Sequence, residues 1–414
     1  MLQPPSRPSA DAHDARHVAL LDAAAQEFNA RGISGASIAR IARTLGLTRA
    51  AVYYYVKDRD DLAAQCYART CAQMAEDLAE AERATTGLGS VLAFLRRALD
   101  PARPPAAVLS ELSYLEGRQR AVILGAHHRN LETLRGFIRA GIADGSVRAC
   151  DDEIVAQTIV GTITWIPLSV DWVEDTDASF RARTVDALAD LLVDGEARDP
   201  DFAFTPEVSI QAFFPEAGNA FDRRAASTAK IEQLLMTASQ LFNRDGIDGT
   251  SLDGITAALG ATKGALYHYL KNKSDLVLRC YRRSFDLTER FADASEKHGR
   301  CGLERALLGL YLNVQAHASG LSPLILMAGA SALPPAAKRE ITRRARRLQR
   351  RFTGFGDQGL ADGSMRRIDF DAVSQLGAGA FEWLPKWFSQ NDPRAAEILA
   401  REIVDLFIKG LRAR

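Results

Sequence analysis

Apolar residues recur every three or four positions along most of the chain, which is the spacing of a helix that buries one face. In residues 17–30, Val18, Leu21 and Phe28 fall on one such face, and Gly32 is expected to end the helix. The alternation of apolar and polar residues that is typical of strands is nearly absent. The pattern therefore predicts an all-α fold.

A short succession of helices follows this first stripe. Ser37 is placed to cap a helix, Gly46 makes a tight turn, and Thr48 is placed to cap the next helix. Asp60 is expected to cap a long fourth helix that begins at Asp61. Two helices joined by a short glycine turn form a helix-turn-helix, in which the second helix enters the major groove of DNA.

The chain repeats this succession. The run TRAAVYYYVKDRDDL at residues 48–62 returns as TKGALYHYLKNKSDL at residues 262–276, a shift of 214 residues. Between residues 28–57 and 242–271, 14 of 30 positions are identical. Because IADGSVR and LADGSMR form a further matching pair later in the chain, we infer a duplication in which each half is a version of one unit.

The duplication sets the expected domain boundaries. The N-terminal residues are rich in proline, serine and charge, which favours disorder. The predicted segments are a disordered arm 1–16, helix-turn-helix domains 17–62 and 228–276, helical regulatory domains 63–195 and 277–414, and a linker 196–227. Helices predicted within the regulatory domains include 106–116, 151–173, 322–331 and 369–389. Four phenylalanines make the linker apolar enough to lie along the surface, so an ordered strap is preferred over a free tether.

Composition excludes several classes of protein. The chain carries 52 basic and 52 acidic residues, so its net charge neither favours nor opposes binding to nucleic acid. Its five cysteines lack metal-ligand spacing and are odd in number, which favours free thiols in a reducing, cytoplasmic setting. No apolar run is long enough for a membrane helix. Because phosphate loops, metal motifs and nucleophile elbows are absent from the sequence, we expect neither an enzyme nor a cofactor.

Each half resembles a TetR-family transcriptional regulator. The likeness is carried by residues 28–62 and 242–276, which include VYYYVKDRDDL and LYHYLKNKSDL, and by a Gly-x-x-x-Gly-x-x-Arg turn that begins at Gly141 and again at Gly359. The resemblance implies an all-helical unit in which three N-terminal helices read DNA and the later helices bind a small effector and dimerise. Members of the family usually carry one unit and form homodimers, so the fusion of two units is a departure.

The geometry of a recognition helix indicates which residues face DNA. A cation next to the N-cap, such as Arg49 or Lys263, reaches guanine, and the small Ala50 and Gly264 allow close approach. The predicted DNA contacts are Ser37, Thr48, Arg49, Ala50, Tyr53, Tyr54, Tyr55, Lys57 and Arg59 in the first copy, and Ser251, Thr262, Lys263, Gly264, Tyr267, His268, Tyr269, Lys271 and Lys273 in the second.

These residues also have a purely structural interpretation. Tyr53 and Tyr267 resemble the DNA-contacting tyrosine of the family, and DNA contact is favoured because three successive aromatic residues cannot share one buried helix face. The serines are either helix caps alone or caps that also bind phosphate. Arg59 and Lys273 are either phosphate ligands, which is preferred, or ordinary solvated side chains.

The regulatory domains contain two candidate effector sites. All four tryptophans, Trp165, Trp172, Trp383 and Trp387, fall in corresponding predicted helices of the two halves. They form either a wall of an effector pocket or, as slightly preferred, packing between the halves. The arginine-rich run at residues 338–352 either binds an anionic effector, such as the acyl-CoA that some family members sense, or is a solvated face, which is preferred.

These features predict a mechanism. We expect the halves to dock through their last helices as an intramolecular pseudo-dimer, which places the recognition helices about 34–36 Å apart in successive major grooves. The operator is expected to be an imperfect palindrome. Binding of a hydrophobic or acyl-CoA effector is expected to release the protein from it. Pairing of two chains into a further homodimer stays open. The alternative function is a constitutive DNA-binding or corepressor protein that senses no effector.

Overall fold

The computed structural model describes residues 10–169, 178–215, 223–326, 333–389 and 395–414. Within these ranges every regular element is a helix, and pairing of the strand type is limited to the isolated bridges Val147–Arg412 and Ala197–Met365. The predicted all-α fold is therefore confirmed. None of the described helices is both long enough and apolar enough to cross a membrane.

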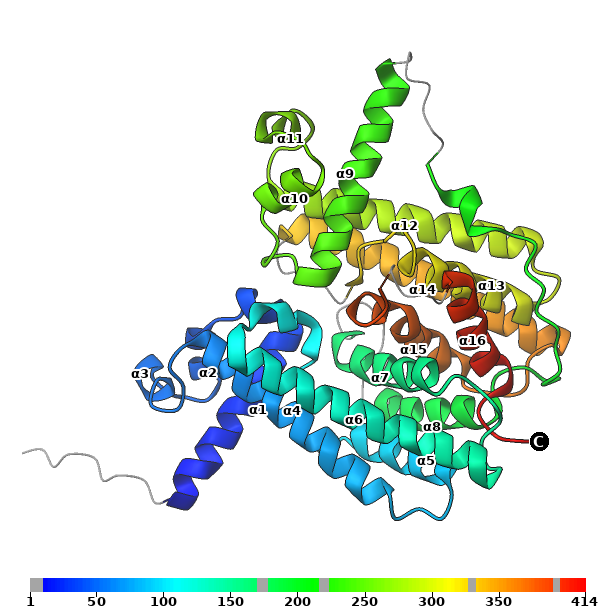
Figure 1. Cartoon of the computed structure of the whole chain (residues 1–414), viewed down its shortest axis with the longest axis horizontal. Helices are drawn as coiled ribbons and strands as arrows, with labels where there is room; N and C mark the ends of the chain where they lie inside the picture. Colours follow the sequence, from blue (N-terminus) through cyan, green and yellow to red (C-terminus); the bar gives the residue numbers. More distant parts are fainter. Residues whose placement is uncertain (1–9, 170–177, 216–222, 327–332, 390–394) are drawn as a thin grey trace, which may run out of the picture.

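In the described part of the chain the α-helices of the two halves follow each other in the same order (Figure 1). The first half contains α1 (Ala10–Gly35), α2 (Ile38–Thr44), α3 (Arg49–Val52), α4 (Arg59–Ala81), α5 (Gly87–Ala98), η1 (Leu109–Tyr114), α6 (Gly117–Asp144), α7 (Asp152–Ser169) and α8 (Ala178–Asp194). After η2 (Ile210–Phe213), the second half contains α9 (Arg223–Asp245), α10 (Leu252–Ala258), α11 (Lys263–Tyr269), α12 (Lys273–His298), α13 (Gly302–His317), α14 (Pro335–Asp362), α15 (Phe370–Glu382), η4 (Leu384–Lys386) and α16 (Ala396–Lys409).

The duplication extends to single hydrogen bonds. The amide of Gly87 donates to Asp144 Oδ2 at 2.8 Å, and the amide of Gly302 donates to Asp362 Oδ2 at 2.7 Å. Glycine is required at both places, because a Cβ on Gly87 would lie 2.1 Å from a backbone nitrogen of α6 and one on Gly302 would lie 2.0 Å from a backbone nitrogen of α14. The same contact therefore holds α5 against α6 and α13 against α14.

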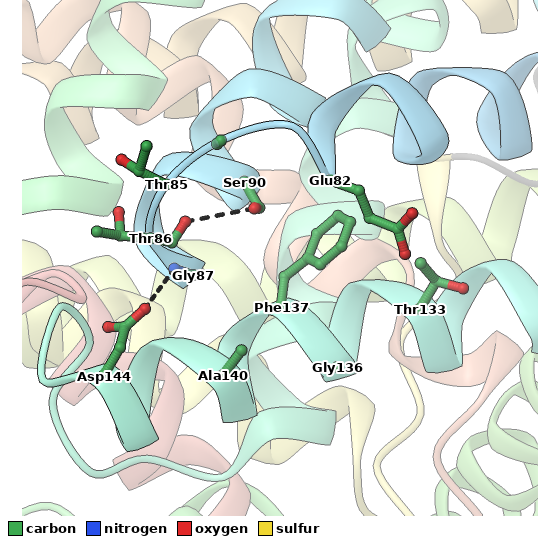
Figure 2. A pocket seen from close by; sticks show the side chains of 11 residues that line it. Glu82, Thr85, Thr86, Gly87, Ser90, Thr133, Gly136, Phe137, Ala140 and Asp144 are labelled. Atoms are coloured by element: carbon green, nitrogen blue, oxygen red, sulfur yellow. Dashed lines mark hydrogen bonds between the residues drawn. The ribbon is translucent and has the colours of Figure 1, made fainter.

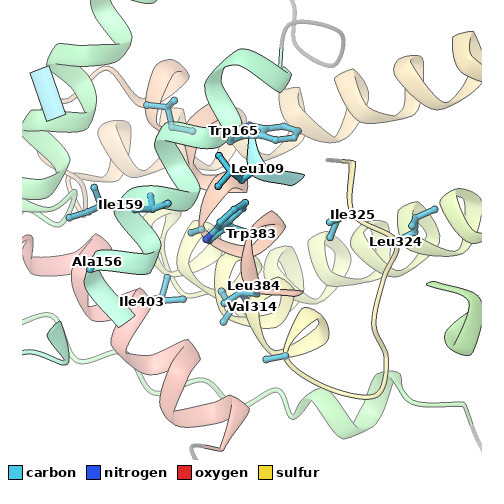
Figure 3. Close-up of a cluster of buried hydrophobic side chains, with 14 of the residues drawn as sticks. Leu109, Ala156, Ile159, Trp165, Val314, Leu324, Ile325, Trp383, Leu384 and Ile403 are labelled. Carbon is cyan, nitrogen blue, oxygen red and sulfur yellow. The ribbon is translucent and has the colours of Figure 1, made fainter. Parts of the chain in front are cut away.

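The halves pack on each other through α7 and α8 from one side and α15 and α16 from the other (Figure 1). Trp165 Nε1 donates to the Gln375 carbonyl at 2.9 Å, and Trp383 Nε1 donates to Gln157 Oε1 at 3.1 Å. Since these two contacts pair corresponding residues reciprocally, the halves are related by a pseudo-two-fold axis, as in an isologous dimer. Figure 3 shows both indoles within the buried apolar cluster that joins the halves.

Close backbone approach makes this pairing possible. A Cβ on Gly161 of α7 would lie 2.6 Å from the carbonyl oxygen of Gly379, and a Cβ on Gly379 of α15 would lie 2.6 Å from Thr162 Cα. The two helices therefore cross at a pair of glycines, where neither helix carries a side chain. A second crossing lies beyond α8 and α16, where Arg148 Nε donates to the Gly410 carbonyl at 2.7 Å and Arg366 Nε to the Gly195 carbonyl at 2.6 Å.

The described part of the linker is an ordered strap, as preferred from the sequence. Phe204 packs edge-on against Tyr311 with 5.5 Å between ring centroids, and Phe213 packs against Phe291 at 4.8 Å. Ile210 and Phe213 are buried, while Phe202 and Phe214 pack against the same core. Burial of these apolar rings stabilises residues 196–215 against the second half; residues 216–222 lie outside the described ranges.

Several expected boundaries are wrong. Helix α1 begins at Ala10, so the last residues of the predicted disordered arm 1–16 are helical. No proline lies between Pro8 and Pro101, and the residues that lead into the apolar stripe tolerate a helix. Helix α9 begins at Arg223, inside the predicted linker 196–227. Asp58, rather than Asp60, caps α4, because its carboxylate accepts from the amide three residues later.

Three predicted helices of the regulatory domains differ from the structure. The region 106–116 contains only the 3-10 helix η1. Residues 322–325 are not helical, because Ser322 has a φ of +38° and Pro323 follows it, and residues 327–331 lie outside the described ranges. The predicted helix 369–389 ends at Glu382, where η4 with Pro385 replaces the last turn.

Candidate nucleic-acid interface and ligand cavity

The first reader domain, α1–α3, has the capping pattern expected from its sequence. Gly32 interrupts the helical geometry of α1 with a φ of +70°. Ser37 Oγ accepts from the Arg40 amide at 3.4 Å, and Thr48 Oγ1 accepts from the Ala51 amide at 3.2 Å. Val52 of α3 is fully buried. The predicted caps are therefore confirmed, and they fix the N-terminus of α3 at the surface.

The second reader domain, α9–α11, repeats these contacts. Ser251 Oγ accepts from the Gly254 amide at 2.9 Å, and Thr262 Oγ1 accepts from the Ala265 amide at 3.3 Å. Leu266 takes the buried position of the recognition helix α11. Figure 1 shows the two reader domains on one side of the molecule, with α3 and α11 outermost.

The outer face of α3 carries a preorganised cation. Arg49 Nη2 donates to the Tyr53 hydroxyl at 2.9 Å, and its guanidinium lies 5.5 Å from the centroid of that ring. Tyr53 is 41% exposed and Tyr54 is 73% exposed, although large aromatic rings are normally covered. Ala50 and Lys57 are also exposed. This combination is typical of a surface that binds phosphates and base edges.

The outer face of α11 differs in its charge. Lys263 Nζ forms an ion pair with Asp253 Oδ1 at 2.7 Å, and the first reader has Ala39 at the position of Asp253. The neighbouring carboxylate raises the pKa of Lys263 and offsets its charge. Tyr267 is 54% exposed, and Gly264, His268 and Lys271 are exposed beside it. The second reader therefore presents a similar shape with less positive charge at its tip.

Four predicted contacts are partly committed to the protein itself. Tyr55 stacks on His17 with 5.7 Å between ring centroids, and both Tyr55 and Tyr269 are half-buried. Arg59 Nη1 donates to the Ser34 carbonyl at 2.7 Å, and Lys273 Nζ donates to the corresponding Asp248 carbonyl at 3.4 Å. The bonds of Arg59 and Lys273 favour a structural role at the turn after the first helix of each reader, although the sequence favours phosphate contacts.

The readers touch each other directly. The side chains of Ser34 and Asp248 are hydrogen-bonded, and Ser113 Oγ donates to the Asp245 carbonyl at 2.9 Å. Glu111 accepts from the Ile33 amide at 2.5 Å and lies against the glycine turn of the second reader. Burial raises the pKa of Glu111. These contacts restrict the distance between the two recognition helices.

A second group of residues joins the second reader to its regulatory domain. Asn243 of α9 donates to the Pro323 carbonyl at 2.8 Å and accepts from the Ile325 amide at 3.0 Å. Lys386 Nζ donates to the Asn243 carbonyl at 2.7 Å, and burial lowers the pKa of this lysine to about 8. Sequence reasoning missed Glu111 and Lys386, which have no counterpart in the repeat. Asn243 was detectable, because Asn29 is identical at the matching position and makes the same clamp on its own half.

A cavity of about 110 Å³ lies among α12, α13, α14 and α15 of the second half. Leu324, Leu348 and Phe352 give it apolar walls, while His317 and Gln375 contribute polar atoms. Trp165 of the first half closes one side of the cavity. This tryptophan therefore packs between the halves and also lines a cavity, so both interpretations of it apply.

The other tryptophans are placed differently. Trp383 is buried between the halves, with its ring centroid 6.3 Å from that of His127. Trp387 is half-buried and packs edge-on against Phe388 at 5.8 Å. Trp172 lies outside the described residues. For Trp383, these contacts favour packing between the halves over a pocket wall.

The arginine-rich run lies on α14 and faces the acidic side of α12. Arg351 Nη2 pairs with Asp293 Oδ1 and its Nε with Glu296 Oε1, both at 2.7 Å. Arg344 pairs with Asp286 at 2.6 Å in the same row. The paired carboxylates raise the pKa of Arg351. Because these cations already have partners, the contacts favour a solvated, self-neutralised face over a site for an anionic effector.

A larger hollow of about 480 Å³ lies at the turn between α4 and α5 (Figure 2). Its polar groups already bond to one another, since Gly87 donates to Asp144 and Ser90 Oγ donates to the Thr86 carbonyl at 3.3 Å. Glu82 and Thr85 at its rim are exposed. The hollow is therefore part of the solvated surface rather than an enclosed site.

Two family profiles each match the chain twice. The profile described as "Bacterial regulatory proteins, tetR family" matches residues 20–66 and 234–280. The profile described as "Tetracyclin repressor-like, C-terminal domain" matches residues 89–195 and 305–411. Each half thus carries both profiles in the same order.

Individual relatives match over shorter stretches. The HTH-type transcriptional regulator AcrR of Shigella flexneri is 40% identical over 53 residues, or 13% of this chain and 25% of the relative. The Transposon Tn10 TetC protein of Escherichia coli is 33% identical over 60 residues, or 14% of this chain and 30% of the relative. The chain therefore matches less than a third of the length of these relatives.

Parts of the chain are also similar to solved structures. AibR in complex with isovaleryl coenzyme A and operator DNA is 19% identical with a TM-score of 0.37, and the match covers 43% of this chain and 98% of that chain. A TetR-family transcriptional regulator from Bordetella parapertussis 12822 is 21% identical with a TM-score of 0.38, and the match covers 44% of this chain and 95% of that chain.

Proposed function

The chain belongs to the TetR family of bacterial regulatory proteins as a tandem of two units, and from this premise we propose that it is a repressor whose halves read one operator together. Its function as a DNA-binding transcriptional regulator follows from the family. The proposal adds that one chain supplies both readers, that the operator has unequal half-sites, and that a small effector releases the DNA.

The reciprocal pairing of the halves carries this proposal. Trp165 with Gln375 and Trp383 with Gln157 pair the same two positions across a pseudo-two-fold axis, as the two subunits of a homodimer do. Such symmetry suits DNA, whose half-sites in successive major grooves are about 34–36 Å apart. A single chain with this pairing needs no second chain to occupy both half-sites.

Differences between the recognition helices support unequal half-sites. Arg49 is replaced by Lys263, and Tyr54 by His268, while the buried positions of the two helices keep their apolar character. Arginine makes bidentate contacts to guanine, whereas lysine acts as a point charge. The operator is therefore an imperfect palindrome, with the stronger base preference expected in the half-site of the first reader.

Effector release follows from the contacts between the cavity and α9. Pro323 forms part of the cavity wall, and its carbonyl accepts from Asn243 on the first helix of the second reader. A ligand that displaces this wall shifts α9, and the contacts between Ser113 and Asp245 transmit the shift to the first half. The operator DNA is then released, because the ligand binds more tightly to the protein in which α9 has shifted.

Operator selection with the purified chain tests the reading of DNA. Random duplexes are enriched on the full-length protein, and light scattering then gives the mass of the complex with the selected duplex. We expect an imperfect palindrome bound by one chain of 45.1 kDa. A perfect palindrome bound by a single chain contradicts unequal reading, and two chains on one operator contradict the intramolecular pseudo-dimer.

A ligand screen separates sensing from constitutive binding. The chain is first tested by thermal shift against small apolar molecules and acyl-CoA thioesters, and each stabilising compound is then added to the protein–operator complex. We expect at least one compound to stabilise the chain and to release the operator. DNA binding that is indifferent to every compound supports the alternative of a constitutive or corepressor protein.

A further inference from the structure

The cavity in the second half has a longer wall than the corresponding region of the first half. Helix α13 has 16 residues and ends at His317, whereas α5 has 12 residues and ends at Ala98. Pro101 and the prolines that follow it stop α5 from extending. The additional turn of α13 therefore supplies His317 to the cavity, next to Asn313, which lies at the position of Ala98 at the end of α5.

The opposite wall differs by one side chain. Helices α6 and α14 correspond with a shift of 218 residues, which places His127 where the second half has Ala345. Ala345 lines the cavity beside Trp165. In the first half, the His127 imidazole stands 6.3 Å from the ring centroid of Trp383, the counterpart of Trp165. The imidazole therefore occupies space that is left open behind the methyl group of Ala345.

Among the described residues that line the cavity, two have a buried polar side-chain atom with no hydrogen-bond partner. The two atoms are Nδ1 of His317 and Oε1 of Gln375, whose residues are 8% and 7% exposed. Both residues line the cavity, and His317 is held there by stacking on Phe381 with 5.3 Å between ring centroids. An unpartnered buried polar atom is costly unless water or a ligand bonds to it. These atoms therefore indicate where a ligand's polar group is held.

We propose that the chain binds one effector per molecule, in the second half only, and that this effector is a compact, uncharged molecule with an apolar body and one hydroxyl or N–H group. This inference rests on the proposed function, because it identifies the class and number of the ligands that regulate DNA binding. Since Trp165 comes from the first half, the single ligand touches both halves of the pseudo-dimer.

Size and charge define the class of ligand. The cavity of about 110 Å³ is smaller than the roughly 150 Å³ apolar cavity that accommodates benzene in another protein, so the ligand is at most about the size of one six-membered ring. Burial lowers the pKa of His317 to about 3, so its imidazole is neutral near pH 7. Glu382, the charged residue in the wall, already accepts from the Leu326 amide at 2.6 Å. An anionic ligand therefore finds no cation among the described wall residues.

Phenol is a suitable probe, because it combines one ring with one hydroxyl donor for Gln375 Oε1 or His317 Nδ1. Crystals of the full chain soaked in phenol count the sites, and thermal-shift titrations compare phenol with benzene and benzoate. We expect phenol in the second half only, with benzene about tenfold weaker and benzoate weaker still. Phenol in both halves or in neither half overturns the single site, and equal binding of benzoate overturns the uncharged class.

A pair of variants tests the asymmetry. Ala345→His gives the second half the residue that the first half has at this position. It should weaken phenol binding about tenfold or more, because the imidazole fills part of the cavity. His127→Ala changes the matching position of the first half and should leave the phenol affinity of the second half within about twofold, because His127 does not line that cavity. Retained binding in Ala345→His overturns the proposal. If that variant folds poorly by circular dichroism, Ala345→Val provides a smaller filling with the same expected direction.

Operator binding is measured separately without phenol, so that the two proposals can fail independently. A chain that binds phenol once but selects no operator contradicts the proposed repressor and leaves the single site standing. A chain that binds its operator and takes up phenol twice, or not at all, keeps the proposed DNA reading and overturns the single site.

Discussion

The two halves share the same arrangement of α-helices but differ in the side chains of their recognition helices and of their regulatory regions. On its recognition helix the first half places Arg49 against Tyr53, whereas the second pairs Lys263 with Asp253. In the regulatory region the order is reversed, because the second half has the cavity beside Trp165 and the first half has His127 at the position of Ala345. The half whose recognition helix carries the less neutralised cation is thus not the half that contains this cavity.

This division is possible because the two units are covalently joined. A homodimer must carry the same side chain at both copies of every position, so each substitution changes both readers and both ligand sites. Here the residues that hold the pair together stay reciprocal, including Gly161 with Gly379 and the two tryptophans. The remaining positions are free to differ, and they do so where DNA and ligand would bind.

The largest expected effect comes from breaking the pairing itself. In Gly161→Leu, the new side chain meets the Gly379 carbonyl, which lies 2.6 Å from the position of a Cβ. We expect a loss of about 3 kcal/mol in the free energy of unfolding, measured with urea, because the close helix crossing cannot accommodate added volume. Operator affinity should fall about 100-fold, since two readers that lose their fixed spacing bind nearly independently.

Gly136→Ala is the matched control for this variant. Gly136 also lies within a helix of the first half, but a Cβ there has no neighbour within 4 Å. Alanine should stabilise the helix by about 0.5–1 kcal/mol and leave operator binding unchanged. If Gly161→Leu behaves like this control, the glycine crossing does not hold the halves together.

The repeat made the fold and the readers predictable. The spacing of Ser37 and Thr48 relative to the following amides defined the caps, and Val52 had to be buried because it lies on the apolar face. Such features depend on neighbours within a few residues. A helix was wrongly predicted for residues 322–325, because the backbone at Pro323 and Ile325 is held by Asn243 from a distant helix, which local periodicity does not reveal.

Acid pH gives the next largest effect and concerns the cavity of the second half. Burial lowers the pKa of His317 to about 3, below the ordinary value of 6.5, so the unfolded chain binds more protons between these values. Stability is therefore complete above pH 6.5 and is lost as the pH falls toward 3. We expect the free energy of unfolding at pH 5 to be about 2 kcal/mol lower than at pH 7 through this histidine.

His317→Gln should remove that share of the pH dependence, which urea unfolding at a series of pH values measures. His127 in the first half provides the comparison, because burial lowers its pKa only to about 4 and its contribution ends at a higher pH. If His317→Gln keeps the slope of the parent protein between pH 7 and 5, then His317 accepts a proton in the folded chain and the cavity is more polar than its walls indicate.

The readers should respond unequally to the loss of their tip cations. Arg49→Ala should weaken binding to the selected operator about tenfold, because arginine makes a bidentate contact that alanine cannot replace. Lys263→Ala should weaken it only about threefold, since Asp253 already offsets the charge and lysine acts as a point charge. Fluorescence anisotropy at fixed salt measures both affinities. Equal losses would mean that the two half-sites are read in the same way.

The positions of Arg49 and Lys263 could be predicted from the sequence, but the neutralisation of Lys263 by an acidic neighbour could not. Arg49 and Lys263 are both next to a capping threonine, so the repeat treats them as equivalent. The ion pair between Lys263 and Asp253 depends on the packing of α10 against α11, which brings residues ten positions apart to within 2.7 Å. Aligning the two readers shows that Asp253 adds a negative charge where the first reader has Ala39, but it does not show that Asp253 pairs with Lys263.

The smallest expected effect isolates this carboxylate. Asp253→Asn keeps the size of the side chain and removes its negative charge, so operator affinity should rise about threefold as repulsion of the DNA phosphates is removed. Ala39→Asp introduces the same charge in the first reader and should lower affinity by a similar factor. Because Asp253 acts partly through Lys263, the gain should shrink in a Lys263→Ala background, which a double-mutant cycle measures. A gain that is unchanged in that background would assign the effect of Asp253 to direct repulsion of DNA alone.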